Sequence, residues 1–267
     1  MLRRCVSRVS VLVLFVVTFV FFAHAAKFSN ASLKGGYSYL INLRTANQST
    51  NQFAMVGVMN FDGAGDVTGS YTSISADTVS SGSLSGHYSI AANGKGEITV
   101  TTGTTAEFAV TLNSFLNGIA QGIELLQIND HNNEIMSGTA VQQSATTQAY
   151  SAASLKGAFA LQYNPWTADG ALAEDGGVAL FTFDGISQVT TSETTVYDGT
   201  TLSGNGSFTY TVSADGTGTI LPTGKGPQFA FALNSVASGL GKGFQFLDTN
   251  TSDGPGNLVI TGSALKQ

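Results

Sequence analysis

The sequence predicts an all-β protein with two tandem up-and-down antiparallel β-barrels of about eight strands each, after an N-terminal signal peptide. Three observations lead to this prediction: an apolar segment near the N-terminus, a long internal repeat, and alternating apolar residues interrupted by glycine-rich turns. We expect the signal peptide at residues 1–25, the first barrel at 31–143, a linker at 144–152 and the second barrel at 153–267.

The N-terminal segment has the three parts of a secretory signal peptide. Arg3, Arg4 and Arg8 give it a basic start, residues 11–22 are almost wholly apolar, and AHA supplies small residues before cleavage after Ala25. The alternative is a membrane anchor, but a spanning helix needs about 20 apolar residues and this run is shorter. We therefore predict a secreted protein, extracellular or periplasmic, with no membrane insertion after signal cleavage.

The cysteine count and the charge of the mature chain limit its compartment and its partners. The only cysteine, Cys5, leaves with the signal peptide, so core packing alone holds the fold, and a bacterial exported protein is favoured. Removal of three arginines leaves eight basic and seventeen acidic residues. Nucleic acid and anionic lipid both bind basic surfaces, so this balance argues against both partners.

The two halves of the chain repeat one another. Three pairs of segments share an offset of 122: LKG at residues 33 and 155, FDG at 61 and 183, and YSIAANGKG at 88 with YTVSADGTG at 210. Further on, FAVTLNS at 108 matches FAFALNS at 229, at an offset of 121. A period of this length indicates a duplicated domain rather than a solenoid. The alternative is that both halves close into one larger sheet.

Each half contains segments with the period-two alternation of strands. Tyr37, Tyr39 and Ile41 share one face of the first strand, and Phe159 and Leu161 have the same parity in the second copy. In the first copy we expect strands near residues 35–43, 52–61, 66–74, 82–91, 96–102, 106–113, 119–128 and 134–142. Strands joined in sequence order most simply close into a barrel, with a β-sandwich as the alternative.

Glycine-containing dipeptides separate these strands. Asp62-Gly63 and Asn93-Gly94 in the first copy, like their counterparts in the second, predict tight hairpins in which both central residues have positive φ.

The opening of each copy resembles the Gly-x-Trp signature of lipocalin-like (calycin-type) barrels. LKGGY at residues 33–37 and LKGAF at 155–159 carry the resemblance, with Tyr37 and Phe159 in place of tryptophan. The resemblance implies an eight-stranded barrel, with a basic residue of the last strand over this aromatic ring. Lys266 occupies that place in the second copy and Gln142 in the first. An apolar pocket is a further implication.

The copies differ most in their first hairpin loop, which is our candidate ligand site. NPWTADGALAEDGG, from Asn164, replaces RTANQSTNQ of the first copy and contains the only tryptophan, Trp166. By the same resemblance this loop lies over the open mouth of a barrel, where an aromatic side chain can stack on an apolar or sugar-like ligand. We assign Trp166, Tyr163 and Tyr39 to ligand binding. Alternatively, Trp166 covers an exposed edge of the core.

We predict no catalytic residue, no metal site and no cofactor. His87 and His131 have no ligand spacing around them, and NDHNNE at residues 129–134 is typical of a solvated turn. Asp248, Asn250 and Asp253 could offer oxygen ligands to calcium, but a turn is again preferred.

Two functions follow from this sequence. One is a non-enzymatic binding module for small apolar ligands; the alternative is a structural or surface-interaction protein with filled barrels. An enzyme ranks third, so we lean against one. An apolar cavity of about 300 Å³ or more would support ligand carriage. Interiors filled by Phe159, Phe181 and Phe231 would support the alternative. The sequence leaves the ligand and the oligomeric state open.

Overall fold

The computed structural model describes residues 27–45, 53–75, 78–103, 105–129, 134–144, 149–166, 176–197, 199–250 and 259–267. The predicted signal peptide and residues 145–148 of the predicted linker lie outside these ranges. The first half contains η1 (Asn30–Ser32), β1 (Lys34–Thr45), β2 (Phe53–Asp62), β3 (Asp66–Ser75), β4 (Thr78–Ile90), β5 (Lys95–Thr102), β6 (Ala106–Leu116), β7 (Ile119–Gln127) and β8 (Glu134–Ser144). The second half contains η2 (Ala152–Ser154), β9 (Lys156–Trp166), β10 (Gly176–Asp184), β11 (Gln188–Tyr197), β12 (Thr200–Val212), β13 (Thr217–Pro222), β14 (Phe229–Asn234), β15 (Gly243–Asp248) and β16 (Val259–Lys266).

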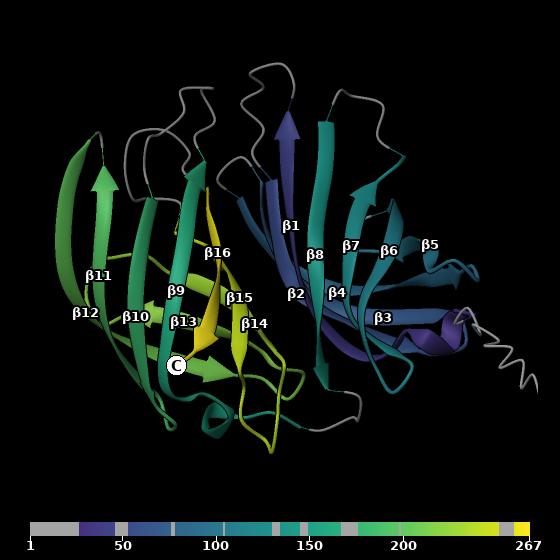
Figure 1. Ribbon diagram of the computed structural model, residues 1–267. Helices are drawn as coiled ribbons and strands as arrows, with labels where there is room; N and C mark the ends of the chain where they lie inside the picture. The colour runs from purple at the N-terminus through teal and green to yellow at the C-terminus, as the bar shows by residue number, and fades with distance from the viewer. Residues whose placement is uncertain are drawn as a thin grey trace, which may run out of the picture.

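The strands form two closed antiparallel barrels in tandem (Figure 1). Within each barrel every strand pairs with its neighbours in sequence, and the pairs β1 with β8 and β9 with β16 close the two barrels. The predicted fold class is therefore confirmed, and the single larger sheet and the β-sandwich are excluded. In the described part of the chain no helix is long and apolar enough to cross a membrane.

The alternation seen in the sequence decides which side chains fill each barrel. Tyr37, Tyr39 and Ile41 are buried in the first barrel, as Phe159 and Leu161 are in the second. The predicted strands of the first copy match β1 to β8 closely. The largest difference is β4, which begins four residues earlier than expected, at Thr78. Its first six residues are exposed, so they lack the apolar alternation that would have indicated a strand.

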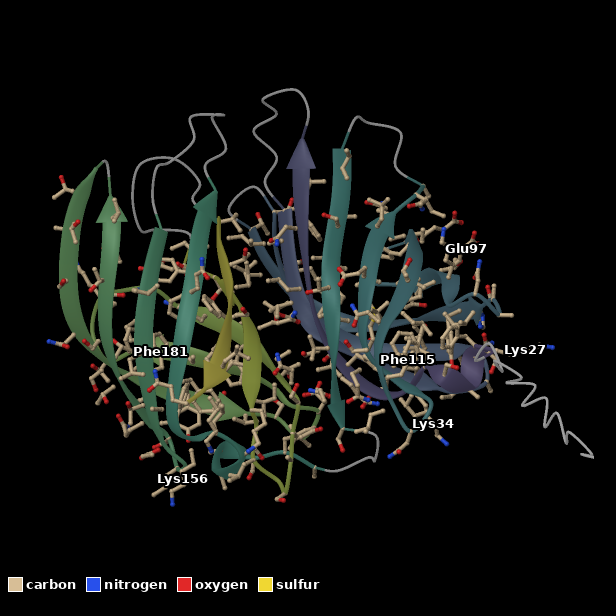
Figure 2. All side chains as sticks on the ribbon, viewed as in Figure 1. Lys27, Lys34, Glu97, Phe115, Lys156 and Phe181 are labelled. Atoms are coloured by element: carbon tan, nitrogen blue, oxygen red, sulfur yellow. The ribbon has the colours of Figure 1, made fainter. Side chains whose placement is uncertain are left out.

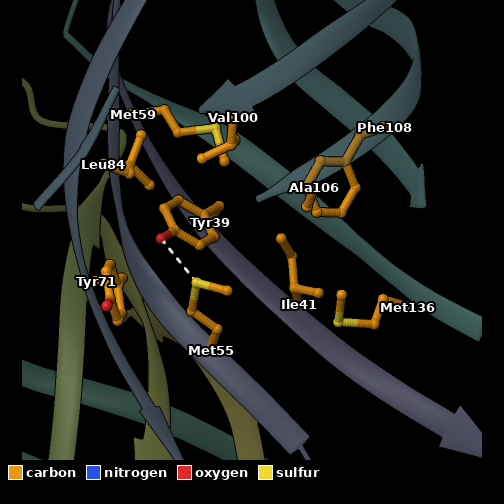
Figure 3. A pocket seen from close by; sticks show the side chains of 10 residues that line it. All are labelled: Tyr39, Ile41, Met55, Met59, Tyr71, Leu84, Val100, Ala106, Phe108 and Met136. Atoms are coloured by element: carbon orange, nitrogen blue, oxygen red, sulfur yellow. Dashed lines mark hydrogen bonds between the residues drawn. The ribbon is translucent and has the colours of Figure 1, made fainter. Parts of the chain in front are cut away.

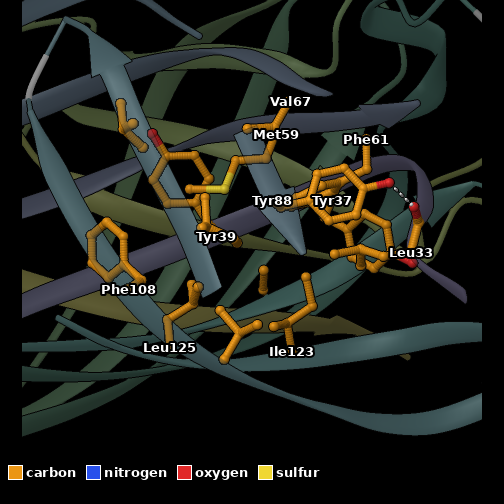
Figure 4. Packing of buried hydrophobic residues seen from close by; sticks show 14 of the residues in the cluster. Leu33, Tyr37, Tyr39, Met59, Phe61, Val67, Tyr88, Phe108, Ile123 and Leu125 are labelled. Carbon is orange, nitrogen blue, oxygen red and sulfur yellow. Dashed lines mark hydrogen bonds between the residues drawn. The ribbon is translucent and has the colours of Figure 1, made fainter. Parts of the chain in front are cut away.

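A short 3₁₀ helix closes the end at which the chain enters each barrel. The Tyr88 hydroxyl donates to the carbonyl oxygens of Leu33 at 2.9 Å and Asn30 at 3.2 Å. In the second barrel Tyr210 makes the same pair of bonds, to Leu155 at 3.1 Å and to Ala152 at 3.0 Å. Figure 4 shows the first of these ends, where Leu33 and Tyr88 lie beside two further aromatic rings.

The glycine turns differ from the two-residue hairpins that we predicted. Asp62 ends β2, and the loop to β3 has three residues, with positive φ at Gly63 (84°) and Gly65 (142°). The Asp62 carboxylate accepts three backbone N–H groups, those of Ala64, Gly65 and Asp66, at 2.7, 2.9 and 3.0 Å. These bonds hold the pKa of Asp62 below its ordinary value. The aspartate is thus a cap on the turn, not a residue in the left-handed region.

The same correction applies to the second predicted dipeptide. In Asn93-Gly94 only Gly94 has positive φ, at 81°. The Asn93 side chain accepts the backbone N–H of Lys95 at 3.1 Å.

The two barrels pack against each other, a contact that the sequence pattern did not predict. The outward side chains of β1, β2 and β3, here called the β1–β3 face, meet those of β14, β15 and β16, the β14–β16 face. Their buried apolar residues form one cluster: Ala54, Val56, Val58, Ile74, Ala230, Ala232, Leu247 and Val259, with Leu40 at its edge. Burial of this cluster stabilises the arrangement of the barrels, since apolar area is removed from water on both sides.

Polar bonds fix the register of this interface. The Ser70 hydroxyl donates to Asp215 Oδ2 at 2.6 Å. Gln245 Nε2 donates to Thr139 Oγ1 at 3.2 Å. The backbone N–H of Ser235 donates to the Gln142 carbonyl at 2.8 Å.

Candidate functional site

The candidate site is a small void inside the first barrel (Figure 3). It has a volume of about 10 Å³, which is close to the minimum that holds one water molecule. The residues that line it are Tyr39, Ile41, Met55, Met59, Tyr71, Leu84, Val100, Ala106, Phe108 and Met136. The lining is apolar except for two tyrosine hydroxyls, so the void suits an apolar group rather than water.

Strand register brings these side chains together. Ile41 of β1 lies opposite Met55 of β2, and Tyr39 lies opposite Gly57. A Cβ atom at Gly57 would come within 2.9 Å of the Tyr39 hydroxyl oxygen and 2.1 Å of the Ser70 carbonyl oxygen. Glycine at this position therefore leaves the space that the Tyr39 ring occupies.

The Tyr39 hydroxyl is the polar group at the void. It donates to the thioether sulfur of Met55 at 3.2 Å, the contact drawn in Figure 3. Burial, with a smaller contribution from Tyr71, raises the pKa of Tyr39 above its ordinary value. Tyr39 is therefore neutral at physiological pH and keeps its hydroxyl proton for hydrogen bonding.

Methionine is over-represented among the residues that line this void. Three of the four methionines in the chain, Met55, Met59 and Met136, line the void. Methionine is unbranched and fills irregular gaps, and it repacks at low cost. None of the three is among the residues that we assigned to ligand binding from the sequence. The clustering of methionines in one copy was the signal that could have identified them.

Phenylalanine fills the corresponding space in the second barrel. Met59 is replaced by Phe181 and Gly86 by Phe208, and these two rings stack with centroids 6.1 Å apart. Phe181, labelled in Figure 2, is buried in the second core. Phe244 is the centre of the network, with four rings around it at centroid distances of 5.5 to 6.1 Å: Phe159, Phe183, Phe231 and Phe246. The second barrel therefore has a packed aromatic core.

The three residues assigned to ligand binding lie in different barrels. Tyr39 lines the void of the first barrel, whereas Tyr163 and Trp166 belong to β9 of the second. Tyr163 is half-buried against the second core, and burial together with the Glu193 charge raises its pKa to about 12. The backbone of Trp166 pairs with Val259, and its side chain and residues 167–175 lie outside the described part of the structure. The structure therefore does not bring the three together into one site.

Metal ligation finds no support in the described residues, which contain no group of three or more His, Cys, Asp or Glu side chains suited to an ion. His87 Nδ1 lies 2.7 Å from Asp66 Oδ1 at an exposed position. Asp248 accepts the backbone N–H of Gln228 at 3.3 Å and of Asn250 at 2.8 Å, as in a turn. His131 and Asp253 lie outside the described residues.

The aromatic residue at the start of each barrel is buried at its closed end. In the second copy the Lys266 ammonium lies 5.9 Å from the centroid of the Phe159 ring. In the first copy the Tyr37 hydroxyl donates to the Ala120 carbonyl at 2.5 Å, and Gln142 Nε2 donates to the Lys34 carbonyl at 3.2 Å. A basic residue of the last strand thus lies near the ring in the second copy, whereas the first copy has a glutamine at this place.

Fold and site together define a tandem β-barrel protein with one methionine-lined and one phenylalanine-filled interior. Comparison with protein families gives no matching family model, and no curated protein matches the sequence.

Several solved structures are similar to this chain at low sequence identity. CghA is 8% identical, with 87% of this chain and 88% of that chain covered and a TM-score of 0.28. A protein of unknown function from Nostoc punctiforme is 12% identical, with 88% and 96% covered and a TM-score of 0.27. The isotype 1 transferrin binding protein B from serogroup B Neisseria meningitidis is 8% identical, with 88% and 77% covered and a TM-score of 0.30. These scores are too low to carry an argument about function.

Proposed function

We propose that this chain is an exported structural or surface-interaction protein whose two barrels are filled scaffolds. The observation that carries the proposal is the packing of the barrel interiors. The void in the first barrel is about 10 Å³, whereas pockets for small molecules have volumes of about 300–1,000 Å³. We therefore propose that partners bind to the outer surfaces of the strands and to the loops, and not inside the barrels.

The second barrel supports the same proposal. Its interior is occupied by a continuous set of aromatic rings, and pairs of such rings contribute about 0.5–1.5 kcal/mol beyond their burial. Opening this interior for a ligand would break several of these contacts. We propose that the second barrel serves as a rigid body.

A second candidate function is the binding of a small apolar ligand in the first barrel. The observation that favours it is the group of three methionines, whose side chains can move to enlarge the void. The lipocalin-like position of Tyr37 and Phe159 at the closed ends supports the same candidate. In this version Tyr39 contacts the ligand, and Tyr163 and Trp166 belong to the mouth of the other barrel.

Native mass spectrometry of the purified mature chain tests the choice between these functions. We expect the mass of the bare polypeptide, and no heat when decanoate is added in isothermal titration calorimetry. A co-purified apolar molecule, or saturable decanoate binding, would overturn the filled-scaffold proposal.

A matched pair of variants locates any ligand that is found. Ala106→Leu closes the void with a side chain larger than its volume of about 10 Å³ holds, so the lining must shift, and Val178→Leu enlarges an exposed outer side chain as the control. Loss of binding in Ala106→Leu alone would assign the ligand to the first barrel.

Export is a separate part of the proposal, and it rests on the N-terminal sequence pattern. The mature chain is expected to begin at Ala26. Intact mass of the protein recovered from the culture medium or periplasm tests this expectation. A chain that retains residues 1–25 would contradict it.

A further inference from the structure

The contact between the two barrels joins two different surfaces. The first barrel contributes its β1–β3 face and the second its β14–β16 face. Because the barrels are repeats, each of these faces has an equivalent on the other barrel. The β9–β11 face of the second barrel is equivalent to the β1–β3 face. The β6–β8 face of the first barrel is equivalent to the β14–β16 face. The β9–β11 face lies outside the interface, and so does the β6–β8 face apart from the residues of β8 that bond to the second barrel.

Strand register confirms that these faces are equivalent. Leu126 lies opposite Ala109 in the first barrel, and Leu247 lies opposite Ala230 in the second. On the other face, β11 spans Gln188–Tyr197 and so has the same length as β3, shifted by the repeat offset of 122.

The β9–β11 face exposes apolar side chains where the β1–β3 face buries them. Val56 is 2% exposed, and its equivalent Val178 is 58% exposed. Ile74 is 3% exposed, and its equivalent Val196 is 40% exposed. Leu265 of the adjoining β16 is 66% exposed. This face also carries an open depression of about 570 Å³ that includes Val178 and Leu265.

The β6–β8 face likewise exposes apolar side chains whose equivalents on the β14–β16 face are buried. Leu126 is 47% exposed, whereas its equivalent Leu247 is fully buried. Ile135 is 53% exposed, whereas its equivalent Val259 is 6% exposed. Each end of the molecule therefore presents an apolar patch that has a buried counterpart at the interface. Exposed apolar patches on soluble proteins mark interaction sites.

The burial of whole strands shows the same contrast. Every residue of β14 and of β15 is buried, because the core covers one side of each strand and the first barrel covers the other. Their equivalents β6 and β7 have exposed residues among the buried ones, as strands with one uncovered side do. Likewise β2 has six consecutive buried residues, and β10 alternates.

We propose that a second copy of this chain docks through its β9–β11 face onto the β6–β8 face of the first copy. The contact repeats the one between the two barrels within a chain. This inference rests on the proposed function, in which the outer surfaces make the interactions. Since the two faces differ, the contact is head-to-tail and leaves a free face at each end, so it propagates into a chain of molecules or closes into a ring.

The polar residues at the equivalent positions also match. Gln245 and Thr139 hydrogen-bond across the interface within the chain, and Glu124 and Ser263 occupy the equivalent positions. A serine hydroxyl can donate to a carboxylate, so Ser263 of one copy can hydrogen-bond to Glu124 of the other, with a charged acceptor. The pair Ser70 and Asp215 is replaced by Ser192 and Asn93, again a hydroxyl donor and an oxygen acceptor.

Sedimentation velocity of the mature chain tests the proposal. Within the chain the linker holds the faces at an effective concentration on the order of millimolar, whereas separate molecules lack this advantage. We therefore expect reversible assembly between about 10 µM and 1 mM, with species larger than the dimer at the upper end. A chain that remains monomeric throughout this range would overturn the inference.

Two single variants distinguish head-to-tail docking from other association. Val178→Lys blocks the β9–β11 face and Leu126→Lys blocks the β6–β8 face, both at exposed positions where lysine remains solvated. Each variant alone is expected to stay monomeric, whereas an equimolar mixture is expected to give a dimer that grows no further, because one intact face of each kind remains. Ile186→Lys, at a 75% exposed position in the turn between β10 and β11, is the control and is expected to assemble like the wild type.

The outcomes separate this inference from the proposed function. Assembly of either blocked variant alone, or failure of the mixture to form a dimer, would overturn head-to-tail docking. Circular dichroism of each variant confirms that it is folded. A ligand found by native mass spectrometry would overturn the filled scaffold and leave the assembly result standing.

Discussion

Leu126 and Leu247 occupy the same position in the two copies, yet only Leu247 is covered by the other barrel. Leu247 belongs to the apolar cluster between the barrels and is fully buried, whereas Leu126 is 47% exposed. The substitutions Leu247→Ala and Leu126→Ala therefore remove the same atoms from the same strand position. The difference between their effects measures the interface contact.

The expected magnitudes differ severalfold. A buried leucine replaced by alanine costs about 2–5 kcal/mol, because its transfer free energy is lost and a cavity remains. Surface substitutions change stability by about 0.5 kcal/mol or less. For a domain pair of this size, a loss of about 3 kcal/mol lowers the Tm by about 6–12 °C. Leu126→Ala should leave the Tm nearly unchanged.

Differential scanning calorimetry at low protein concentration, where molecules do not associate, is the assay. Equal losses in the two variants would refute the reasoning, since they would mean that the two leucines have the same surroundings. So would a Leu247→Ala variant as stable as the wild type, which would mean that the barrels do not pack together in solution.

Three further predictions concern the cores and the hydrogen bonds. Phe244→Ala removes the central ring of the second barrel and is expected to cost about 3–5 kcal/mol in urea unfolding; a loss below 1 kcal/mol would contradict the packed core. Burial raises the pKa of Tyr88 to about 12. The contribution of its neutral hydroxyl to folding stability is therefore complete below pH 10 and is lost as the pH rises through 12. In the Tyr88→Phe variant the free energy of unfolding should therefore fall less steeply between pH 10 and pH 12 than in the wild type. An equal fall in both proteins would contradict this prediction. Burial alone would raise the pKa of Asp215, but hydrogen bonds from Ser70 and Thr217 lower it below its ordinary value. Its stabilisation is therefore present above about pH 4 and lost on acidification. Asp215→Asn should cost about 1–2 kcal/mol at pH 7 and reduce the acid sensitivity, measured by urea unfolding at pH 7 and pH 3; an unchanged acid response would contradict it.

The strand pattern and the closure of each barrel were predictable because they depend on local alternation. A period of two places Tyr37 and Tyr39 on one side of β1, and a shift of one residue would expose the whole set. The repeat strengthened this prediction, since Phe159 and Leu161 show the same parity. The turn at Asp62 was less predictable, because the three-residue loop depends on a side-chain bond to backbone N–H groups that the dipeptide alone does not reveal.

The candidate site was only partly predictable. Tyr39 was assigned from the sequence and lines the void. Met136 was missed because its place at the void depends on how the first and last strands close the barrel. Tyr163 and Trp166, which we also assigned to ligand binding, lie in β9 of the second barrel, and equivalent strands of a tandem pair belong to separate interiors.

By itself the sequence determined the duplication, the strand order and the inward side chains, because these follow from patterns along one copy. Only the tertiary structure decided which outward side chains are covered. Val56 and Val178, like Leu247 and Leu126, are repeat equivalents with the same local pattern, yet one of each pair is buried. The burial of an outward side chain depends on which surface another part of the chain brings against it, and no local periodicity records that contact.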